Sequence, residues 1–195
     1  MPRIPLVDKS DLPEEYDIID RQRSKLPDRI DSSFWNDQPT VRTFSNNPLM
    51  GEAHVTGNTI MWTESGLSDR ESECVIMTIA QKLDCELLWH DHVNLSLKFD
   101  RLSVPEMQDM ADEEFERFDE KTRTLLDYVV EYINEHGAVS DETHTLLSEY
   151  YDEETVVGIV MLAGFYVSLS HEVRALEIQR DHFVGWKLDK LSVLE

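Results

Sequence analysis

Apolar residues recur at helical spacing through most of this chain. Between residues 119 and 136, for example, Leu125, Leu126, Val129 and Ile133 fall on one face of a helix. No segment shows the sustained alternation of apolar and polar residues that is typical of a half-buried strand. The pattern therefore predicts an all-α protein.

Polar residues at regular places mark where these helices begin. Ser68 with Glu71, and Ser103 with Glu106, have the spacing of capping boxes, in which each side chain accepts a hydrogen bond from the other residue's backbone N–H. The N-caps expected on this basis are Ser68, Asp84, Ser103, Ser140 and Asp152. The helices expected are 14–23, 48–64, 68–81, 84–100, one that starts at 103, 119–136, 141–150 and 153–179.

The helix predicted at 84–100 carries candidate chemistry. Cys85, Leu88, Trp89 and His92 share one stripe of it, because positions i, i+3, i+4 and i+7 lie together on a helix. A second histidine, two positions before His92, lies near the opposite face, so the two do not form a chelating pair. No metal site is predicted.

Glu73 lies on the preceding helix, at the edge of its apolar side, where a buried carboxylate needs a partner. A short turn at 82–84 would pack the two helices antiparallel and could bring His92 to Glu73. A histidine held by a carboxylate has a fixed tautomer, which suits it to transfer protons near neutral pH. If Cys85 lies within reach, the same imidazole can generate its thiolate.

The spacing of these residues resembles that of the alkylhydroperoxidase D-like (AhpD-like) proteins of the carboxymuconolactone decarboxylase superfamily. Redox members of that family carry Glu, eleven residues, Cys, two residues, Cys, three residues, His. Glu73, Cys85 and His92 match, whereas Leu88 stands in the place of the second cysteine. The resemblance covers residues 44–115 well. Arg101 departs from the resemblance. The family usually has a glycine at this place, which would end a helix in the left-handed region.

The resemblance implies a single AhpD-like domain over residues 1–195, a bundle of about eight helices packed antiparallel and orthogonally. Residues 1–40 would form an N-terminal arm with a short helix, 41–115 the carboxymuconolactone decarboxylase-like core hairpin, and 116–195 the C-terminal helices. Relatives form trimers or hexamers, so a homo-oligomer is expected. The apolar segment 156–169 is a reasonable interface for it.

Leu88 removes the cysteine pair of the redox branch, so a two-cysteine cycle is not available within this motif. The decarboxylase branch dispenses with the pair and implies proton transfer by Glu73 and His92, with Cys85 beside them. We therefore predict a carboxymuconolactone decarboxylase-like enzyme that acts on a small organic substrate, carboxylated or not, by lyase- or isomerase-type chemistry. Two alternatives stay open. One is a one-cysteine peroxidase or thiol oxidoreductase centred on Cys85, and the other is an oligomeric family scaffold without catalysis.

The substrate pocket is expected to be compact and largely apolar. A carboxylated substrate would need local cations, and Arg42, Arg70, Lys98 and Arg101 are the nearest in sequence. Trp89 is as compatible with the core as with a pocket wall. The residues predicted to bind the substrate are Leu88, Trp89, Met61, Trp62, Phe99, Arg42 and Arg70.

The charge composition limits the partners of the chain. Its 18 Lys and Arg stand against 40 Asp and Glu, for a formal net charge of −22. Nucleic acid and anionic membrane surfaces are not expected partners, because both bind basic patches. The expected partners are a small-molecule substrate and further copies of the chain. Only 7 of the 18 cations are lysine, and such a surface suits a halophilic cytosol, although an ordinary acidic protein has it too.

The cysteine count and the N-terminus bear on location. Cys74 and Cys85 do not indicate a disulfide framework, and residues 1–5 do not read as a signal peptide. The longest apolar run, 156–169, is shorter than the roughly 20 residues of a membrane-spanning helix. We expect a cytoplasmic protein that uses no cofactor.

Overall fold

The computed structural model describes residues 2–8, 11 and 38–179. Within these residues all regular structure is helical, as predicted, and the helix expected at 14–23 lies outside them. The helices are α3 (Pro39–Phe44), α4 (Pro48–Glu64), α5 (Asp69–Lys82), α6 (Glu86–Phe99), α7 (Val104–Asp112), α8 (Glu120–Asn134), α9 (Asp141–Ser148) and α10 (Glu153–Ala175).

Most helices begin at the predicted caps. The Ser68 and Ser103 hydroxyls accept from the backbone N–H three residues on, and both reciprocal glutamate bonds are present, so both capping boxes are confirmed. Ser140 and Asp152 cap α9 and α10 in the same way, and Asp119 caps α8. These local signals place five of the helix starts before any tertiary contact is considered.

The start of α6 differs from the prediction. Asp84 is not the N-cap, because it adopts the left-handed conformation with φ 54° and belongs to the turn after α5. Aspartate tolerates this conformation better than most residues, since its short side chain can bond locally. Cys85 takes the N-cap position instead. The thiol therefore lies at the end of the helix and not on the stripe that Leu88 and His92 share.

Two other boundaries also differ. Helix α3 lies where the sequence indicated the end of an irregular arm, and Pro39 occupies its first turn, where a proline is tolerated. Helix α10 ends at Ala175, before the predicted residue 179, and Glu177 is left-handed with φ 52°. Neither difference moves a residue of the candidate site.

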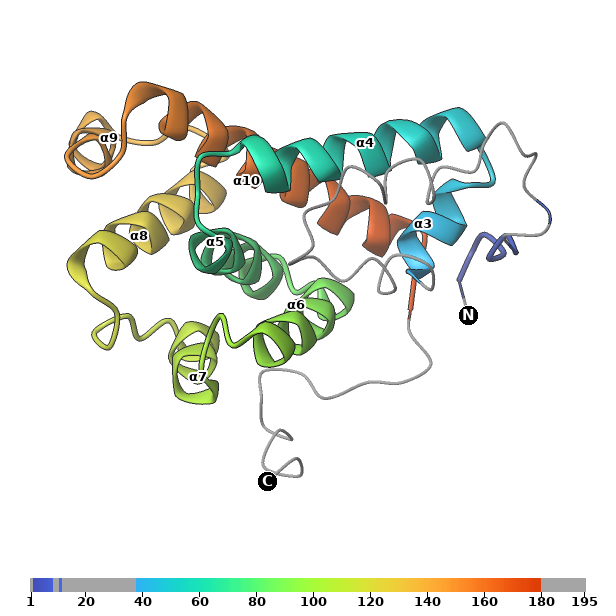
Figure 1. Ribbon diagram of the computed structural model, residues 1–195, viewed down its shortest axis with the longest axis horizontal. Helices are drawn as coiled ribbons and strands as arrows, with labels where there is room; N and C mark the ends of the chain where they lie inside the picture. Colours follow the sequence, from blue (N-terminus) through green and yellow to red (C-terminus); the bar gives the residue numbers. More distant parts are fainter. Residues whose placement is uncertain (1, 9–10, 12–37, 180–195) are drawn as a thin grey trace.

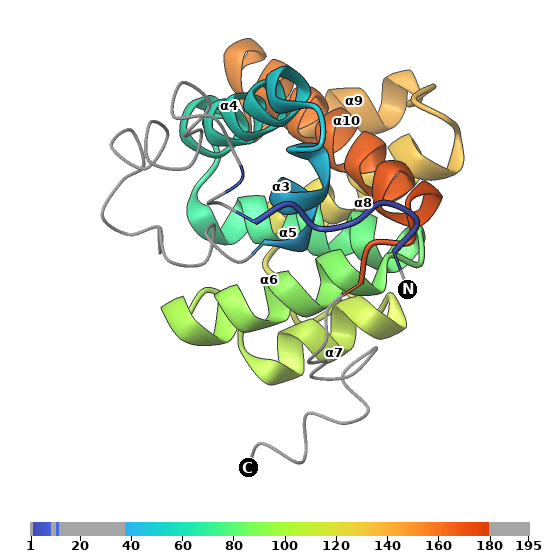
Figure 2. The same cartoon turned by 90° about the vertical axis from the view of Figure 1, so that its right-hand side faces the viewer.

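Helix α5 is the centre of the bundle (Figures 1 and 2). It packs against α6, α7, α8 and α10, and residues 72–80 are all buried. In Figure 1, α4 and α10 run across the view while α5 is seen nearly along its axis, so α5 crosses this pair steeply. Helix α4 packs on α10 and α3. The bundle thus surrounds the buried middle part of α5, on which Glu73 lies.

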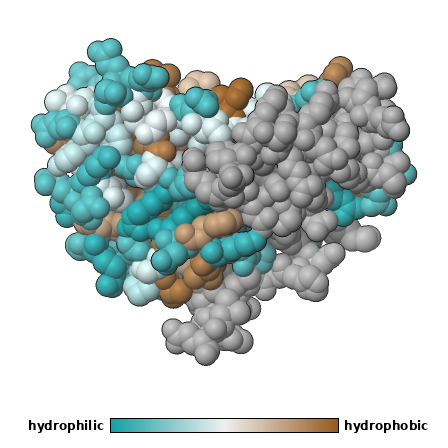
Figure 3. Space-filling view, viewed as in Figure 1, coloured by the Kyte–Doolittle hydropathy of each residue, from teal (hydrophilic) through white to brown (hydrophobic). Residues whose placement is uncertain are grey.

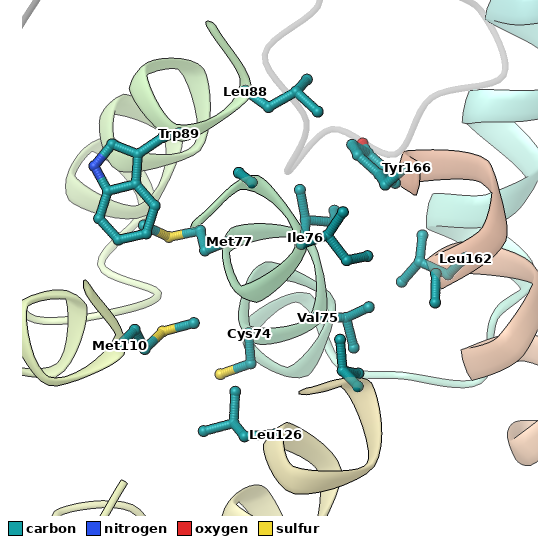
Figure 4. Close-up of a cluster of buried hydrophobic side chains, with 14 of the residues drawn as sticks. Cys74, Val75, Ile76, Met77, Leu88, Trp89, Met110, Leu126, Leu162 and Tyr166 are labelled. Carbon is teal, nitrogen blue, oxygen red and sulfur yellow. The ribbon is translucent and has the colours of Figure 1, made fainter. Parts of the chain in front are cut away.

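The core forms around the side chains of α5 (Figure 4). Met77 lies on the side of Trp89, whereas Ile76 lies on the side of Tyr166 and Leu162. Trp89 has no exposed surface. Of the two interpretations of Trp89 that the sequence left open, the structure favours the core.

The outer side of α10 keeps apolar residues exposed, with Val157 62% and Met161 53% accessible. This helix is long and apolar enough to cross a membrane by length and composition, a test that core helices of soluble proteins also pass. Its inner side packs against α4 and α5. Figure 3 shows mostly hydrophilic residues on the described part of one face, in keeping with the net charge of −22.

Candidate functional site

Glu73 and His92 form the centre of the site. Glu73 has no exposed surface, and its Oε2 lies 2.7 Å from Nδ1 of His92 on α6. The hairpin of α5 and α6 therefore brings the two together as the sequence predicted. When Glu73 is a carboxylate it can only accept, so Nδ1 of His92 then donates and Nε2 of the neutral ring has a lone pair.

Arg101 contacts the other oxygen of Glu73. Its Nη1 lies 2.6 Å from Oε1 of Glu73, and its Nη2 lies 3.6 Å from Oδ2 of Asp69 on the same helix. The left-handed residue at the end of α6 is Asp100, with φ 52°, one residue before Arg101. Arg101 turns back onto α5, where its charge is buried and paired.

Aromatic rings enclose this cluster. The ring of Trp62 on α4 lies parallel to that of His92 with centroids 6.0 Å apart, and Tyr166 on α10 meets His92 edge to face at 5.5 Å. The Tyr166 hydroxyl accepts from Nε1 of Trp62 at 2.8 Å and from Nδ2 of Asn58 at 3.2 Å. Burial raises the pKa of Tyr166, so the hydroxyl stays protonated and can donate its hydrogen to a ligand.

These side chains surround a cavity of about 50 Å³. One water molecule needs roughly 10 to 15 Å³ on the same measure, so the space suits a compact organic molecule. The walls are His92, Trp62, Tyr166 and Arg101, the apolar side chains of Leu88, Leu95 and Leu169, and the polar side chains of Gln38, Thr40, His54, Asn58 and Asp91.

Two polar wall residues keep an unsatisfied buried atom. Oδ1 of Asn58 and Nε2 of Gln38 have no hydrogen-bond partner in the part of the chain that the structure describes. Leaving such an atom unpaired costs about 1 to 3 kcal/mol, so a ligand that supplies the missing partners binds with that advantage. Neither residue was predicted, because a lone amide carries no signal in a sequence.

Two of the predicted pocket residues, Trp62 and Leu88, line the cavity. Their neighbours Met61 and Trp89 do not. Met61 packs against the core as a partly buried residue, and Trp89 lies within the core. Adjacent positions on a helix differ by about 100°, so the neighbour of a wall residue faces elsewhere.

The predicted cations Arg42 and Arg70 and the ring of Phe99 also lie outside the cavity. Arg42 binds a carboxylate and a carbonyl of residues 2–8 and holds that segment against α3. Arg70 pairs with Glu106 on α7. Phe99 lies 4.9 Å from the guanidinium of Arg101, and both line an open groove outside the cavity. The cation in the cavity wall is thus Arg101, one of four candidates in the sequence.

Cys85 is 1% exposed and does not line the cavity. Burial raises the pKa of its thiol, although hydrogen bonds with the Leu88 backbone and the Ser170 side chain act in the opposite direction. Burial also raises the pKa of Cys74, to about 12. A thiol with a raised pKa is a weak nucleophile near neutral pH. None of the described contacts joins Cys85 to His92.

His54 lines both this cavity and a second hollow of about 510 Å³ between α3, α4 and α10. Its ring stacks on Phe165 with centroids 5.4 Å apart and meets Phe44 edge-on at 4.7 Å. Burial lowers the pKa of His54 to about 4. The imidazole is therefore neutral at physiological pH.

We expect His54 to weaken the fold in mild acid. Its folded pKa of about 4 is below the ordinary value of 6.5, so the unfolded state binds the proton first. The free energy of unfolding therefore falls as the pH decreases from 6.5 towards 4. The loss reaches about 3 kcal/mol, because each unit of pKa difference corresponds to about 1.36 kcal/mol. His54→Phe keeps the ring contacts and should lose this part of the pH dependence in urea unfolding. His144→Phe, at an exposed histidine, should keep it. If the free energy of unfolding changed with pH equally in His54→Phe and the wild type, His54 would not be the source of this pH dependence.

The described side chains thus offer a base, a neutral hydroxyl donor and a paired cation around one cavity. Among residues 2–8, 11 and 38–179, no group of three or more His, Cys, Asp or Glu side chains is arranged to hold a metal ion.

Comparison with known proteins bears on the fold. No protein-family model and no curated protein matches the sequence. Among solved structures, an uncharacterized peroxidase-related protein from Silicibacter sp. TM1040 is similar, with a TM-score of 0.73 and 15% identity over 95% of both chains. An alkylhydroperoxidase AhpD core protein from Ralstonia eutropha JMP134 has a TM-score of 0.73 and 14% identity over 92% of both chains.

The debrominase Bmp8, in complex with 2,3,4-tribromopyrrole, is also similar. Its TM-score is 0.70 at 15% identity, over 98% of this chain and 97% of that chain. Such low identities establish the fold and nothing finer. The chain has the AhpD-core helical fold that the spacing of Glu73, Cys85 and His92 predicted, a fold that it shares with peroxidase-related proteins.

Proposed function

We propose that this chain is an acid–base enzyme in which Glu73 and His92 transfer protons on a small organic substrate, with lyase- or isomerase-type chemistry similar to that of carboxymuconolactone decarboxylases. The proposal depends on one observation, the buried hydrogen bond of 2.7 Å between Glu73 and His92 at the cavity wall. A carboxylate-bound imidazole is a suitable general base. The buried thiol of Cys85, with its raised pKa, favours this reaction over a thiol peroxidase.

The reaction follows from the positions of the donors and acceptors. Nε2 of His92 takes a proton from a carbon next to a carbonyl group, and the C–H electron pair moves into the carbonyl to form an enolate. The Tyr166 hydroxyl donates a hydrogen bond to the enolate oxygen. Glu73 stabilises the imidazolium, which returns its proton to a different carbon. In a decarboxylation the C–C electron pair moves into the carbonyl as carbon dioxide leaves, and a His92 that has already taken a proton from water gives it to the enolate carbon.

The charges around the cavity support an uncharged substrate over a carboxylated one. The Asp91 carboxylate lies in the wall, and the Arg101 guanidinium is already paired with Glu73. A substrate carboxylate would lie beside a second carboxyl group and a cation that already has a partner. The 2,3,4-tribromopyrrole in the Bmp8 structure is also an uncharged molecule.

The test is proton exchange in deuterated water with a panel of small uncharged lactones, enones and heterocycles, followed by nuclear magnetic resonance. We expect deuterium to enter a carbon next to a carbonyl or imine group. His92→Asn should slow this exchange about 100-fold or more, the usual contribution of a general base. His90→Asn is the matched control, because His90 is on the same helix, pairs with Asn94 and does not line the cavity.

Cys85→Ser separates this proposal from the thiol alternative. Under acid–base chemistry the variant should retain most of the exchange activity. Loss of turnover in Cys85→Ser together with full activity in His92→Asn would overturn the proposal and assign the chemistry to the thiol.

A further inference from the structure

Arg101 and His92 bind opposite oxygens of one carboxylate. Nη1 of Arg101 lies 2.6 Å from Oε1 of Glu73, and Nδ1 of His92 lies 2.7 Å from Oε2. The Glu73 side chain has no exposed surface. Its two oxygens are therefore bound by these two neighbours and not by bulk water.

Two hydrogen patterns are chemically possible for the buried pair. As a carboxylate, Glu73 accepts from Nδ1–H of His92 and leaves Nε2 with a lone pair. As a neutral acid, Glu73 donates to bare Nδ1, and the ring hydrogen is then on Nε2, which cannot accept another proton. This second pattern holds one proton more than the first, taken up from water. Only the first pattern makes His92 a base towards a ligand in the cavity.

Arg101 favours the first pattern. Burial alone favours a neutral acid, whereas a permanently charged guanidinium at hydrogen-bond distance favours the carboxylate. The guanidinium is held in place, because it lies 5.1 Å from the ring centroid of Trp62 and 4.9 Å from that of Phe99. The ring of Trp62 also lies parallel to that of His92, so one indole fixes both neighbours of Glu73.

We propose that Arg101 is a positioning residue of this site, which holds Glu73 as a carboxylate and so keeps the hydrogen of His92 on Nδ1. Nε2 then stays available for proton transfer. The inference rests on the proposed function of the Glu73–His92 pair, but the tautomer can be measured without a substrate. Arg101 acts through Glu73 and does not touch the reacting atoms.

The test compares Arg101→Met with the wild type, using protein labelled with nitrogen-15 at histidine. Methionine keeps an unbranched stem against Trp62 and Phe99 but removes the charge. Near neutral pH we expect the His92 hydrogen on Nδ1 in the wild type and on Nε2 in the variant, whose Glu73–His92 pair takes up one proton from water. The variant should also show the infrared C=O stretch of a protonated carboxylic acid. Retention of Nδ1–H without that band would overturn the proposal.

Three other variants make the result specific. Arg101→Lys keeps a positive charge and should keep the wild-type tautomer. Lys98→Met removes a cation that also lies over the ring of Phe99, at 5.6 Å, and should leave His92 unchanged. An equal tautomer change in Lys98→Met would contradict a specific role for Arg101. If Arg101→Met does not fold, Arg101→Gln replaces it with the same expected tautomer, because it keeps hydrogen-bond donors without the charge.

Turnover gives an independent readout once a substrate is identified. Arg101→Met should lower kcat about 10- to 100-fold with little change in KM, because the variant lacks the basic nitrogen and not a substrate contact. A rise in KM at constant kcat would contradict the positioning role and indicate a binding role. If the tautomer changes as expected while no substrate turns over, the proposed function fails and the role of Arg101 stands.

Discussion

Glutamine in place of Glu73 lowers the free energy of unfolding by about 3 to 5 kcal/mol, the usual cost of removing one partner from a buried ion pair. The Arg101 guanidinium is only 7% exposed and would keep Asp69, at 3.6 Å, as its acidic partner. An amide has nearly the shape of a carboxylate, so lost packing contributes little. Urea unfolding at neutral pH measures the effect.

Glu113→Gln is the matched control for this change. Glu113 pairs with Lys82 at the C-terminal end of α5 at 3.1 Å, with side chains 42% and 17% exposed. Such a pair contributes at most about 1 kcal/mol. The double variant of Glu73→Gln with Arg101→Met should recover part of the loss, because it also removes the buried cation that lost its nearer carboxylate. Equal losses in Glu73→Gln and Glu113→Gln would mean that burial does not strengthen the Glu73 pair.

Gly158→Ala should lower the free energy of unfolding by about 3 kcal/mol, at the upper end of the cost of overpacking. A Cβ at this position of α10 would lie 2.6 Å from the carbonyl carbon of Ser65 and closer still to its oxygen. Both atoms belong to the backbone at the end of α4, so no side-chain rotation relieves the contact. The helices must move apart, and that movement separates Tyr166 from Trp62 and weakens the cavity.

Gly164→Ala is the control on the same helix. Its Cβ would meet the Tyr132 hydroxyl at 3.4 Å, an ordinary contact. Alanine is also a better helix former than glycine by about 1 kcal/mol, so this variant should be neutral or more stable in urea unfolding. A similar loss for both variants would show that helix α10 does not depend on the close approach at Ser65.

The local part of the fold could be predicted from the sequence, because helix caps are short-range signals. Ser68, Ser103 and Ser140 each bind a backbone N–H three residues away, and their helices begin where the spacing indicated. Asp84 failed as a predicted cap because aspartate favours both N-caps and left-handed turns. The choice between these depends on how α5 and α6 connect, which the local sequence does not specify.

Only the part of the candidate site that lies within the α5–α6 hairpin could be predicted from the sequence. Glu73 and His92 face each other because two adjacent helices fold back through a short turn, and their spacing shows this. Arg101 was seen as one of several nearby cations, but nothing in its sequence position indicated that it would bind Glu73. Asn58 and Tyr166 come from α4 and α10, and nothing in a sequence without tertiary information joins them.

The two halves of the site differ in the length of chain that must close to form them. Glu73 is 19 residues from His92 and 28 from Arg101, whereas Trp62 is 104 residues from Tyr166. Contacts between residues close in sequence cost less loop entropy and form earlier in folding. The α5–α6 hairpin can therefore bring Glu73, His92 and Arg101 together before α10 docks, and the later arrival of Tyr166 closes the cavity beside them.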